Sequence, residues 1–161
     1  MNLINFELQY DNHFVAMEYY NLIMNRTFLI LLTKNHLIGI KGNGFIGTES
    51  GDDLLTQLAT RSIVVRGDLM NPYSYIKAKY IRKIENEDFH GRDFLLKEKS
   101  NFIINRNEII NVRYDSTKKW GMGYYPHDGK IYIETKNTKK REFIILGNQS
   151  GYDIAHFIMS K

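Results

Sequence analysis

The 161-residue sequence contains no cysteine and only two prolines. Without cysteine there are no disulfide bonds and no thiolate ligands, so a metal site would need histidines and carboxylates. No apolar run approaches the 18 or more residues of a membrane-spanning helix, and the run at Phe28–Leu32 has only the length of a strand. The first residues lack the basic and apolar regions of a signal peptide. We therefore expect a cytoplasmic protein with no transmembrane segment.

The composition is that of an ordinary globular protein with a modest positive excess. Hydrophobic residues make up 43% and charged residues 25% of the chain, as is usual for a folded domain. The net charge of +4 and the pI near 9.1 would indicate nucleic acid only if the lysines shared one face. They are spread along the chain instead. There is no repeat, low-complexity tract or linker, so we expect a single domain over residues 1–161.

A glycine motif of the form G-x-G-x-x-G occupies Gly42–Gly47, after an expected strand. A dinucleotide site would also need a helix opened by these glycines and an acid about 20 residues on, which Asp68 nearly supplies. Thr48–Gly51 interrupts the place where that helix should run. We favour a glycine-rich turn and expect no cofactor. The adhesion-like tripeptide Arg66–Asp68 is interpreted as chance.

Residues with catalytic or metal-binding chemistry form no recognisable constellation. No histidines stand at i, i+4 with a third ligand in view, and no serine lies in a nucleophile elbow. The carboxylates of Asp52–Asp53 and Glu87–Asp88 are typical of a helix start and a solvated loop. We expect no metal and no catalytic residues, with convergence of groups from distant positions as the open alternative.

The N-terminal half predicts helices around one β-hairpin. Residues 12–25 carry Phe14, Met17 and Met24 at helical spacing, which indicates an amphipathic helix. The apolar runs 28–33 and 36–41 predict a hairpin whose first strand is covered on both faces. The further elements expected here are a helix at 52–60, an extended segment at 62–66 and a helix that begins at Asn71–Pro72. That last helix would present Tyr73, Ile76, Tyr80 and Ile84 on one face.

The last third has a clearer pattern of short strands. Alternation of apolar and polar residues predicts strands at 109–114 and 130–135, and short apolar runs predict strands at 101–105 and 142–146. Asp128–Gly129 is a strong turn signal. Residues 152–159 predict a final amphipathic helix whose inward side chains are Ile154, Phe157 and Ile158.

This order of elements resembles a bacterial pleckstrin-homology-like domain of the PH/GRAM type. The segments that carry the resemblance are Phe102–Ile104, Glu108–Ile109, Val112, Gly129–Ile133, Phe143–Leu146 and the helix from Tyr152. The resemblance implies an α+β fold: a PH-like antiparallel β-barrel or strongly bent sheet with a C-terminal helix and extra N-terminal helices. Residues 1–26 would be an N-terminal helical decoration, 50–85 a helical insertion, and 98–160 the PH-like strands and closing helix.

The resemblance implies a fold and an interaction scaffold. It does not by itself imply lipid binding, because fold alone does not set function. Eukaryotic PH domains that bind inositol phosphates carry a basic cluster in the first hairpin loop. Here that loop offers only Lys34 and, further on, Lys41. An inositol lipid is therefore not supported as a partner.

The loop Lys118–His127 combines positive charge, flat aromatic rings and two glycines. The candidate binding residues are Arg113, Lys118, Lys119, Trp120, Tyr124, Tyr125 and His127. Such a mixture presents aromatic anchors to a protein, or stacks single-stranded bases beside phosphate contacts. The simpler alternative is a long turn whose tryptophan folds back to plug the end of the barrel.

The sequence thus favours a non-enzymatic interaction domain that binds a protein partner or forms a homo-oligomer. The alternatives are a single-stranded nucleic-acid-binding protein that uses the same loop and, last, an enzyme with an unrecognised site.

Overall fold

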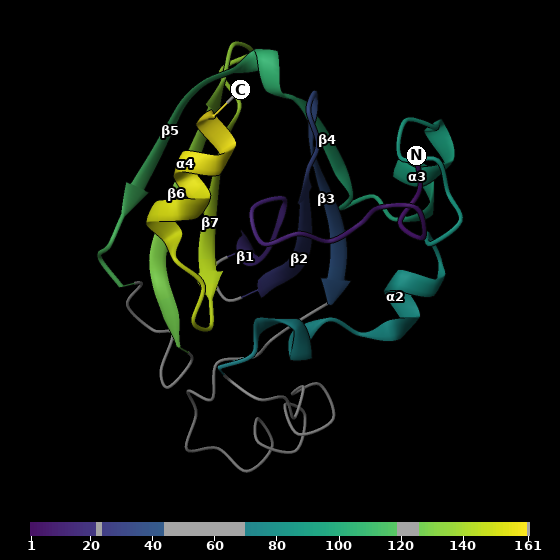
Figure 1. The fold of residues 1–161 in the computed structure, drawn as a ribbon, viewed down its shortest axis with the longest axis horizontal. Helices are drawn as coiled ribbons and strands as arrows, with labels where there is room; N and C mark the ends of the chain where they lie inside the picture. The colour runs from purple at the N-terminus through teal and green to yellow at the C-terminus, as the bar shows by residue number, and fades with distance from the viewer. Residues whose placement is uncertain (22–23, 44–69, 119–125, 161) are drawn as a thin grey trace.

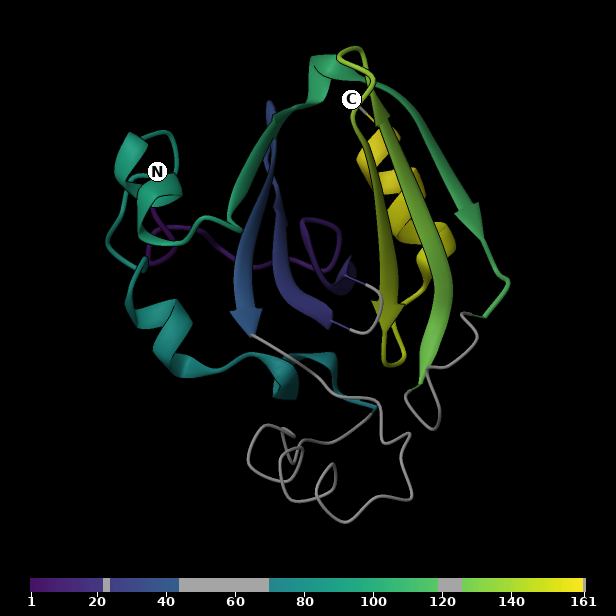
Figure 2. The ribbon, with the colours of Figure 1, turned by 180° about the vertical axis from the view of Figure 1, so that it is seen from behind.

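The computed structural model describes residues 1–21, 24–43, 70–118 and 126–160. These residues form one antiparallel sheet of seven strands in the order β4-β3-β2-β1-β7-β6-β5. The strands are His13–Asn21 (β1), Met24–Leu32 (β2), His36–Asn43 (β3), Phe102–Asn105 (β4), Ile109–Asp115 (β5), His127–Thr135 (β6) and Lys140–Leu146 (β7). The sheet curls into a half-barrel, with the short helix α4 (Gly151–Met159) after its last strand (Figures 1 and 2).

The sheet separates two hydrophobic cores. The inner core lies inside the half-barrel, where Phe28, Phe102 and Phe143 pack with Ile154 and Ile158 of α4. The outer core lies on the opposite face, where side chains of β1, β2, β3 and β7 meet the buried residues of the segment before β4: Ile84, Phe89 and Phe94. Successive strand residues point to opposite faces, so β2 is buried on both, as its apolar run predicts.

The helix expected at residues 12–25 is wrong, because His13–Asn21 is a strand. Phe14, Val15, Ala16 and Met17 are all at most 1% exposed. An amphipathic helix buries only one stripe of its surface, whereas a strand between two neighbours buries both faces. β1 has those neighbours, β2 and β7. The described part of residues 1–26 therefore contains no N-terminal helix, and the helices before α4 are short and lie later in the chain.

The hairpin expected over 28–41 is confirmed by the pairing of β2 with β3. Its turn is held by Thr33, whose Oγ1 accepts a hydrogen bond from the backbone N of His36 at 2.9 Å. Gly39 is required by close packing. A Cβ at this position would lie 2.0 Å from Cε1 of Phe102, the first residue of the neighbouring strand β4.

The helix expected from Asn71–Pro72 begins as predicted but is broken. The Asn71 side chain accepts from the backbone N of Tyr73 and caps a short 3-10 helix, η1 (Pro72–Tyr75). Ile76 and Lys77 are extended, and α2 (Ala78–Arg82) follows. The break has a tertiary cause, because the backbone N of Lys77 donates to the carbonyl of Gly42 on β3 at 2.8 Å. The last helix of this segment is α3 (Arg92–Lys97).

The turn expected at Asp128–Gly129 is also wrong, since both residues lie within β6. Gly129 has φ of +67°, and the pairing of β6 with β7 shifts register between His127 and Lys130. These are the features of a β-bulge. The Asp128 carboxylate accepts from the Tyr114 hydroxyl at 3.0 Å and from the backbone N of Gly151 at 2.7 Å. The bulge thereby joins the sheet to the start of α4.

The other strands expected in the last third are confirmed, at β4, β5, β6 and β7, and so is the final helix. Ile154 and Ile158 are buried as predicted, while Phe157 is half-buried.

The half-barrel is open between its outer strands, β4 and β5, and Arg106 bridges that opening. This residue begins η2 (Arg106–Glu108), which joins the two strands. Its guanidinium donates to the carbonyl of Thr33 at 3.1 Å and to those of Phe157 and Ile158 at 2.9 Å each, and it also donates to Ser160. Arg106 therefore ties the C-terminal end of α4 to the β2–β3 turn.

Some expectations lie outside the described residues: the helix at 52–60, the strand at 62–66, most of the glycine motif, and the tripeptide at 66–68. No helix in the described part of the chain is long and apolar enough to cross a membrane.

Candidate functional site

The candidate binding residues from the sequence are only partly described. Lys119, Trp120, Tyr124 and Tyr125 lie outside the described residues. Arg113 lies on β5 with its side chain 58% exposed. Lys118 is exposed beyond the end of β5, whereas His127 is buried at the start of β6. A binding surface on this loop stays a prediction.

The outer face of β5 and β6 carries charges of both signs. The guanidinium of Arg113 lies over the ring of Tyr132, 4.2 Å from its centroid, and 3.9 Å from the Asp115 carboxylate. Lys130 Nζ is 3.5 Å from the same carboxylate. A hydrogen bond with Tyr132, together with that carboxylate, raises the pKa of Lys130. These cations are balanced by an acid, so this part of the face is no continuous basic stripe.

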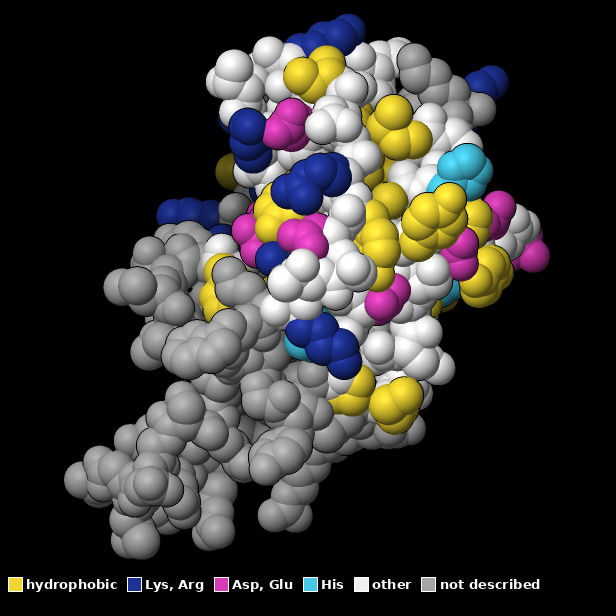
Figure 3. All heavy atoms as spheres, turned by 90° about the vertical axis from the view of Figure 1, so that its left-hand side faces the viewer, with side chains coloured by type: hydrophobic (Ala, Val, Ile, Leu, Met, Phe, Trp, Pro, Cys, Tyr) yellow, Lys and Arg dark blue, Asp and Glu magenta, His cyan; other side chains and the backbone are white. Residues whose placement is uncertain are grey.

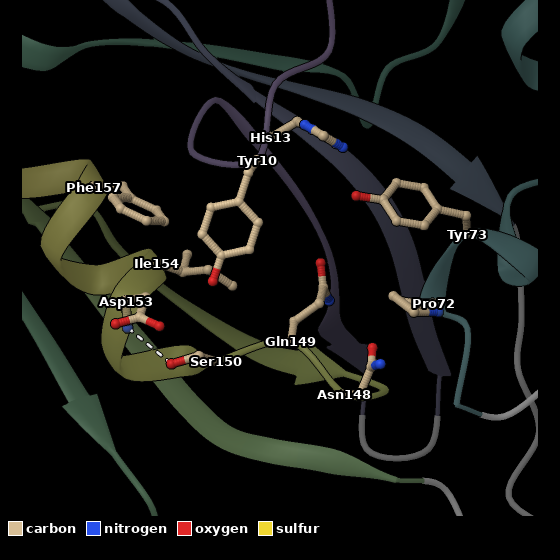
Figure 4. Close-up of a pocket in the computed structure, with 10 residues that line it drawn as sticks. All are labelled: Tyr10, His13, Pro72, Tyr73, Asn148, Gln149, Ser150, Asp153, Ile154 and Phe157. Carbon is tan, nitrogen blue, oxygen red and sulfur yellow. Dashed lines mark hydrogen bonds between the residues drawn. The ribbon is translucent and has the colours of Figure 1, made fainter.

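A pocket of about 320 Å³ opens elsewhere, between the N-terminal segment, η1 and the start of α4 (Figure 4). Its lining combines three aromatic side chains, a histidine and a carboxylate. The lining residues are Tyr10, His13, Pro72, Tyr73, Asn148, Gln149, Ser150, Asp153, Ile154 and Phe157. Three separate stretches of sequence meet here, which makes it the candidate functional site.

The pocket lies where β1 and β7 part. The two strands pair only at Ala16–Ile145 and Met17–Ile144. On the N-terminal side of this pairing in β1, the Gln149 side chain makes the hydrogen bonds that a neighbouring strand would otherwise make. Its Oε1 accepts from the Val15 backbone N at 2.8 Å, and its Nε2 donates to the carbonyls of Val15 and Leu146 at 2.6 and 2.7 Å. A carboxamide has two N–H donors, so Gln149 has none left for a ligand.

Gly147 brings η1 against the loop that leads into α4. Its φ is +68°, a conformation in which glycine avoids the strain of a side chain. A Cβ here would lie 2.8 Å from both the Met70 carbonyl oxygen and Cδ of Pro72. Glycine is therefore needed for backbone conformation and for close approach, and this approach holds Tyr73 at the pocket.

The aromatic rings of the pocket form two contacting pairs. Tyr10 meets Phe157 edge-on, with centroids 5.9 Å apart and planes at 81°. His13 and Tyr73 have centroids 5.5 Å apart and planes at 48°. In the view of Figure 4 Phe157 and Tyr73 lie at opposite sides, with Tyr10 between them. Tyr10 is 80% exposed and Tyr73 40% exposed. Burial raises the pKa of Tyr73, so its hydroxyl stays protonated at neutral pH.

The polar groups of the pocket include the Asp153 carboxylate, which only accepts, and the hydroxyl and amide groups of Tyr10, Tyr73, Asn148 and Ser150, which can donate and accept. The backbone N of Asp153 donates to the Ser150 Oγ at 3.1 Å, which caps α4. The Asp153 carboxylate makes no ion pair with any described residue. His13 Nδ1 lies 2.7 Å from the carbonyl oxygen of Gln9. A carbonyl only accepts, so Nδ1 carries the proton and the neutral ring keeps Nε2 as an acceptor.

Two other clusters of titratable side chains lie outside the pocket. His36 and His90 come together with ring centroids 4.7 Å apart, a pairing that their sequence spacing does not indicate. Burial, and then the charge of His90, lower the pKa of His36. Inside the half-barrel the Arg141 guanidinium binds the Glu18 carboxylate at 3.0 and 3.1 Å and stacks 3.7 Å from the Phe102 ring centroid. Within the described residues, no three His, Asp or Glu side chains gather as a metal site requires.

Sequence reasoning missed the pocket because its residues have no shared motif. Tyr10 precedes β1 and His13 begins it, Tyr73 follows the Asn71 cap, and Asp153 and Phe157 stand one turn apart on α4. The spacing of Asp153 and Phe157 is the one available signal, since residues four apart share a helix face. It does not reveal which other segments face them.

No family model, curated protein or solved structure matches the chain.

Proposed function

We propose that this protein is a non-enzymatic interaction domain that binds a partner protein, and that the pocket at Tyr10 and Phe157 is its binding site. The observation that carries this proposal is the exposure of large apolar side chains on the N-terminal segment and on α4, two of the elements that form the pocket. In the N-terminal segment Leu8 is 50% and Tyr10 80% exposed, and on α4 Tyr152 is 70% and Met159 47% exposed. Contiguous exposed apolar surface on a soluble protein usually marks an interaction site, and the exposed ring of Tyr10 is contiguous with Phe157 of α4, which it contacts edge-on.

The distribution of side chains over this face supports the same proposal. Seen from the β5 side, hydrophobic side chains gather toward the right of the view, while most lysines and arginines lie toward its left and centre (Figure 3). Protein interfaces are depleted in lysine at their cores and enriched in tyrosine and other aromatic residues. The lining of the pocket, with two tyrosines, one phenylalanine and no lysine, has this composition.

The topology supports a PH-like scaffold for this function. The two meanders β1–β4 and β5–β7 join through β1 and β7, remain open between β4 and β5, and are followed by one helix. A strongly bent antiparallel sheet followed by a C-terminal helix is what the resemblance implies. The segment between β3 and β4 is then an insertion, and it contributes Tyr73 to the pocket. On this proposal the domain acts in the cytoplasm.

The polar groups of the pocket already serve the fold, which favours binding over catalysis. Gln149 completes the hydrogen bonding of β1, and Ser150 caps α4. A nucleophile needs a base within hydrogen-bond reach, and among the described residues neither the Ser150 hydroxyl nor the tyrosine hydroxyls of the pocket hydrogen-bond to His13.

The test is selection of random displayed peptides against the full-length chain. Selected peptides are measured on the wild type, on Tyr10→Ser and on Tyr73→Ser, with Leu96→Ser as the control. Leu96 is 74% exposed on α3 and does not line the pocket. Truncation of an aromatic anchor at an interface should weaken binding by about tenfold or more.

Peptides that lose affinity on Tyr10→Ser and Tyr73→Ser but retain it on Leu96→Ser support the proposal. Equal binding to all four proteins would place the interaction elsewhere and would refute this site. Sedimentation of the same variants tests self-association: a dimer of the wild type that Tyr10→Ser dissociates identifies a second copy as the partner.

A further inference from the structure

The charge of the pocket differs in sign from that of the whole chain. The chain has 22 lysines and arginines against 18 aspartates and glutamates. Among the described residues, the pocket lining contains no lysine or arginine and one acid, Asp153. Its carboxylate has no ion-pair partner among the same residues. A cation that enters this pocket would meet a negative charge that no described side chain pairs with.

We infer that the pocket receives a cationic side chain, a lysine or arginine of the partner protein, between aromatic faces and the Asp153 carboxylate. This inference rests on the proposed function and specifies what the partner inserts.

The aromatic walls supply the first part of the recognition. Tyr10, Tyr73 and Phe157 all reach the pocket, and the faces of aromatic rings attract cations through their quadrupole. The edge-on contact of Tyr10 with Phe157 holds one ring against the other at 81°. Two rings set at such an angle offer a corner and not a flat wall. The aliphatic part of a lysine or arginine side chain packs in such a corner while its charged end reaches a polar group.

The hydrogen-bonding groups supply the second part. The Asp153 carboxylate offers acceptors, and so does Nε2 in the neutral tautomer of His13 whose Nδ1 donates to Gln9. Both N–H groups of the Gln149 amide are already used on Val15 and Leu146. A guanidinium or ammonium group carries donors only, so it suits the Asp153 carboxylate, the one acid among the described lining residues.

The size of the pocket agrees with a side chain as its occupant. Its volume of about 320 Å³ is at the lower end of the range for small-molecule sites, roughly 300–1,000 Å³. The exposed ring of Tyr10, which lines the pocket, would then contact the flanking residues of the partner.

The test uses N-acetyl-arginine amide as the probe and N-acetyl-citrulline amide as its neutral isostere. Both are titrated into the full-length chain, and binding is followed through the backbone amide NMR signals of Tyr73, Ser150 and Asp153. Asp153→Asn removes the charge and Tyr10→Leu removes an exposed ring. Asp93→Asn is the matched control, because Asp93 also stands in the first turn of a helix but away from the pocket.

We expect saturable shifts with the arginine probe and affinity about tenfold weaker for the citrulline probe. Asp153→Asn and Tyr10→Leu should each lower the affinity for arginine by several-fold, while Asp93→Asn leaves it unchanged. Equal affinity for the two probes would overturn the inference. So would an equal loss on Asp93→Asn and Asp153→Asn, since the probe would then respond only to total charge.

The two proposals fail in different ways. Displayed peptides that bind at Tyr10 but contain no lysine or arginine would overturn the inference of a cationic side chain and retain the protein-binding function. Arginine-probe binding at Asp153, without any peptide whose binding depends on Tyr10, would overturn the protein-binding function and retain cation binding by the pocket.

Discussion

Replacement of Arg106 by alanine should release the C-terminal end of α4 from the sheet. The Arg106 guanidinium donates to the carbonyls of Phe157, Ile158 and Ser160 at the end of α4 and to Thr33 in the β2–β3 turn. The last carbonyls of a helix have no partner within the helix. A cation at this end also interacts favourably with the helix dipole. Arg106 supplies both effects across the opening between β4 and β5.

The expected loss is about 2 kcal/mol in the free energy of unfolding. A hydrogen bond to a charged group contributes about 1.5–3 kcal/mol net. The three bonds to α4 come from one nitrogen and are not additive, and water reaches these carbonyls once the side chain is gone. Partial burial also lowers the pKa of the guanidinium, a sign that its charge loses hydration in the fold. In a protein of this length 2 kcal/mol corresponds to a fall of about 4–8 °C in Tm.

The assay combines urea unfolding with amide hydrogen exchange on wild type, Arg106→Ala and Arg106→Lys. Exchange should accelerate in the last turn of α4 and remain unchanged in β2 and β3. Lysine keeps the charge but not the forked donors, so we expect an intermediate loss. Arg82→Ala is the control, because Arg82 is exposed at the end of α2. An unfolding free energy of Arg106→Ala within about 0.5 kcal/mol of wild type, with unchanged exchange in α4, would refute the role of Arg106.

Two further predictions concern the inner core. Gly39→Ala should lower the free energy of unfolding in urea by about 3 kcal/mol, because its Cβ would lie 2.0 Å from the Phe102 ring. Phe102→Leu in the same chain should recover part of that loss. An unchanged free energy of unfolding for Gly39→Ala would contradict this packing. Burial raises the pKa of Glu18 above 4.5, and the attraction of Arg141 offsets this only in part. The contribution of Glu18 to the free energy of unfolding is therefore fully present below pH 4.5 and declines as the pH rises through the folded pKa. Glu18→Gln should therefore stay within about 1 kcal/mol of wild type at pH 7 and flatten that decline, while Arg141→Met, which leaves a buried carboxylate unpaired, should cost about 3 kcal/mol. Unfolding measured from pH 4 to 8 checks both, and a larger loss for Glu18→Gln than for Arg141→Met would contradict the sign.

Sequence patterns predicted the elements whose burial follows from local alternation. The apolar run at Phe28–Leu32 indicated a strand covered on both faces, and the alternation at Lys130–Thr135 indicated a strand with one face inward; both are confirmed. β1 was mistaken for a helix because Phe14, Met17 and Met24 happen to fall at helical spacing. Its real periodicity is hidden, since both faces of a central strand are apolar.

Side-chain bonds across the chain account for the other errors. Asp128 and Gly129 have the composition of a hairpin turn, but the Asp128 carboxylate holds the start of α4, 23 residues further on. The residues at Ile76 and Lys77 have helical propensity in sequence, yet a backbone bond from Lys77 to Gly42 keeps them extended. Local propensity is weak, of the order of a few tenths of a kcal/mol per residue, so one tertiary hydrogen bond is enough to override it.

The sequence by itself determined the antiparallel β character, the hairpin at β2 and β3 and the closing helix, because these depend on periodicities of two and about four residues. Only the tertiary structure decided that β1 pairs with β7 and so joins the two meanders β1–β4 and β5–β7. It also decided that the separation of β1 from β7 leaves a pocket that Gln149 lines. The physical reason is that Tyr10, Tyr73 and Asp153 acquire a common environment only when the sheet curls and brings three distant segments together. The pocket, and a carboxylate with no ion pair among the described residues, are therefore properties of the fold that no local pattern encodes.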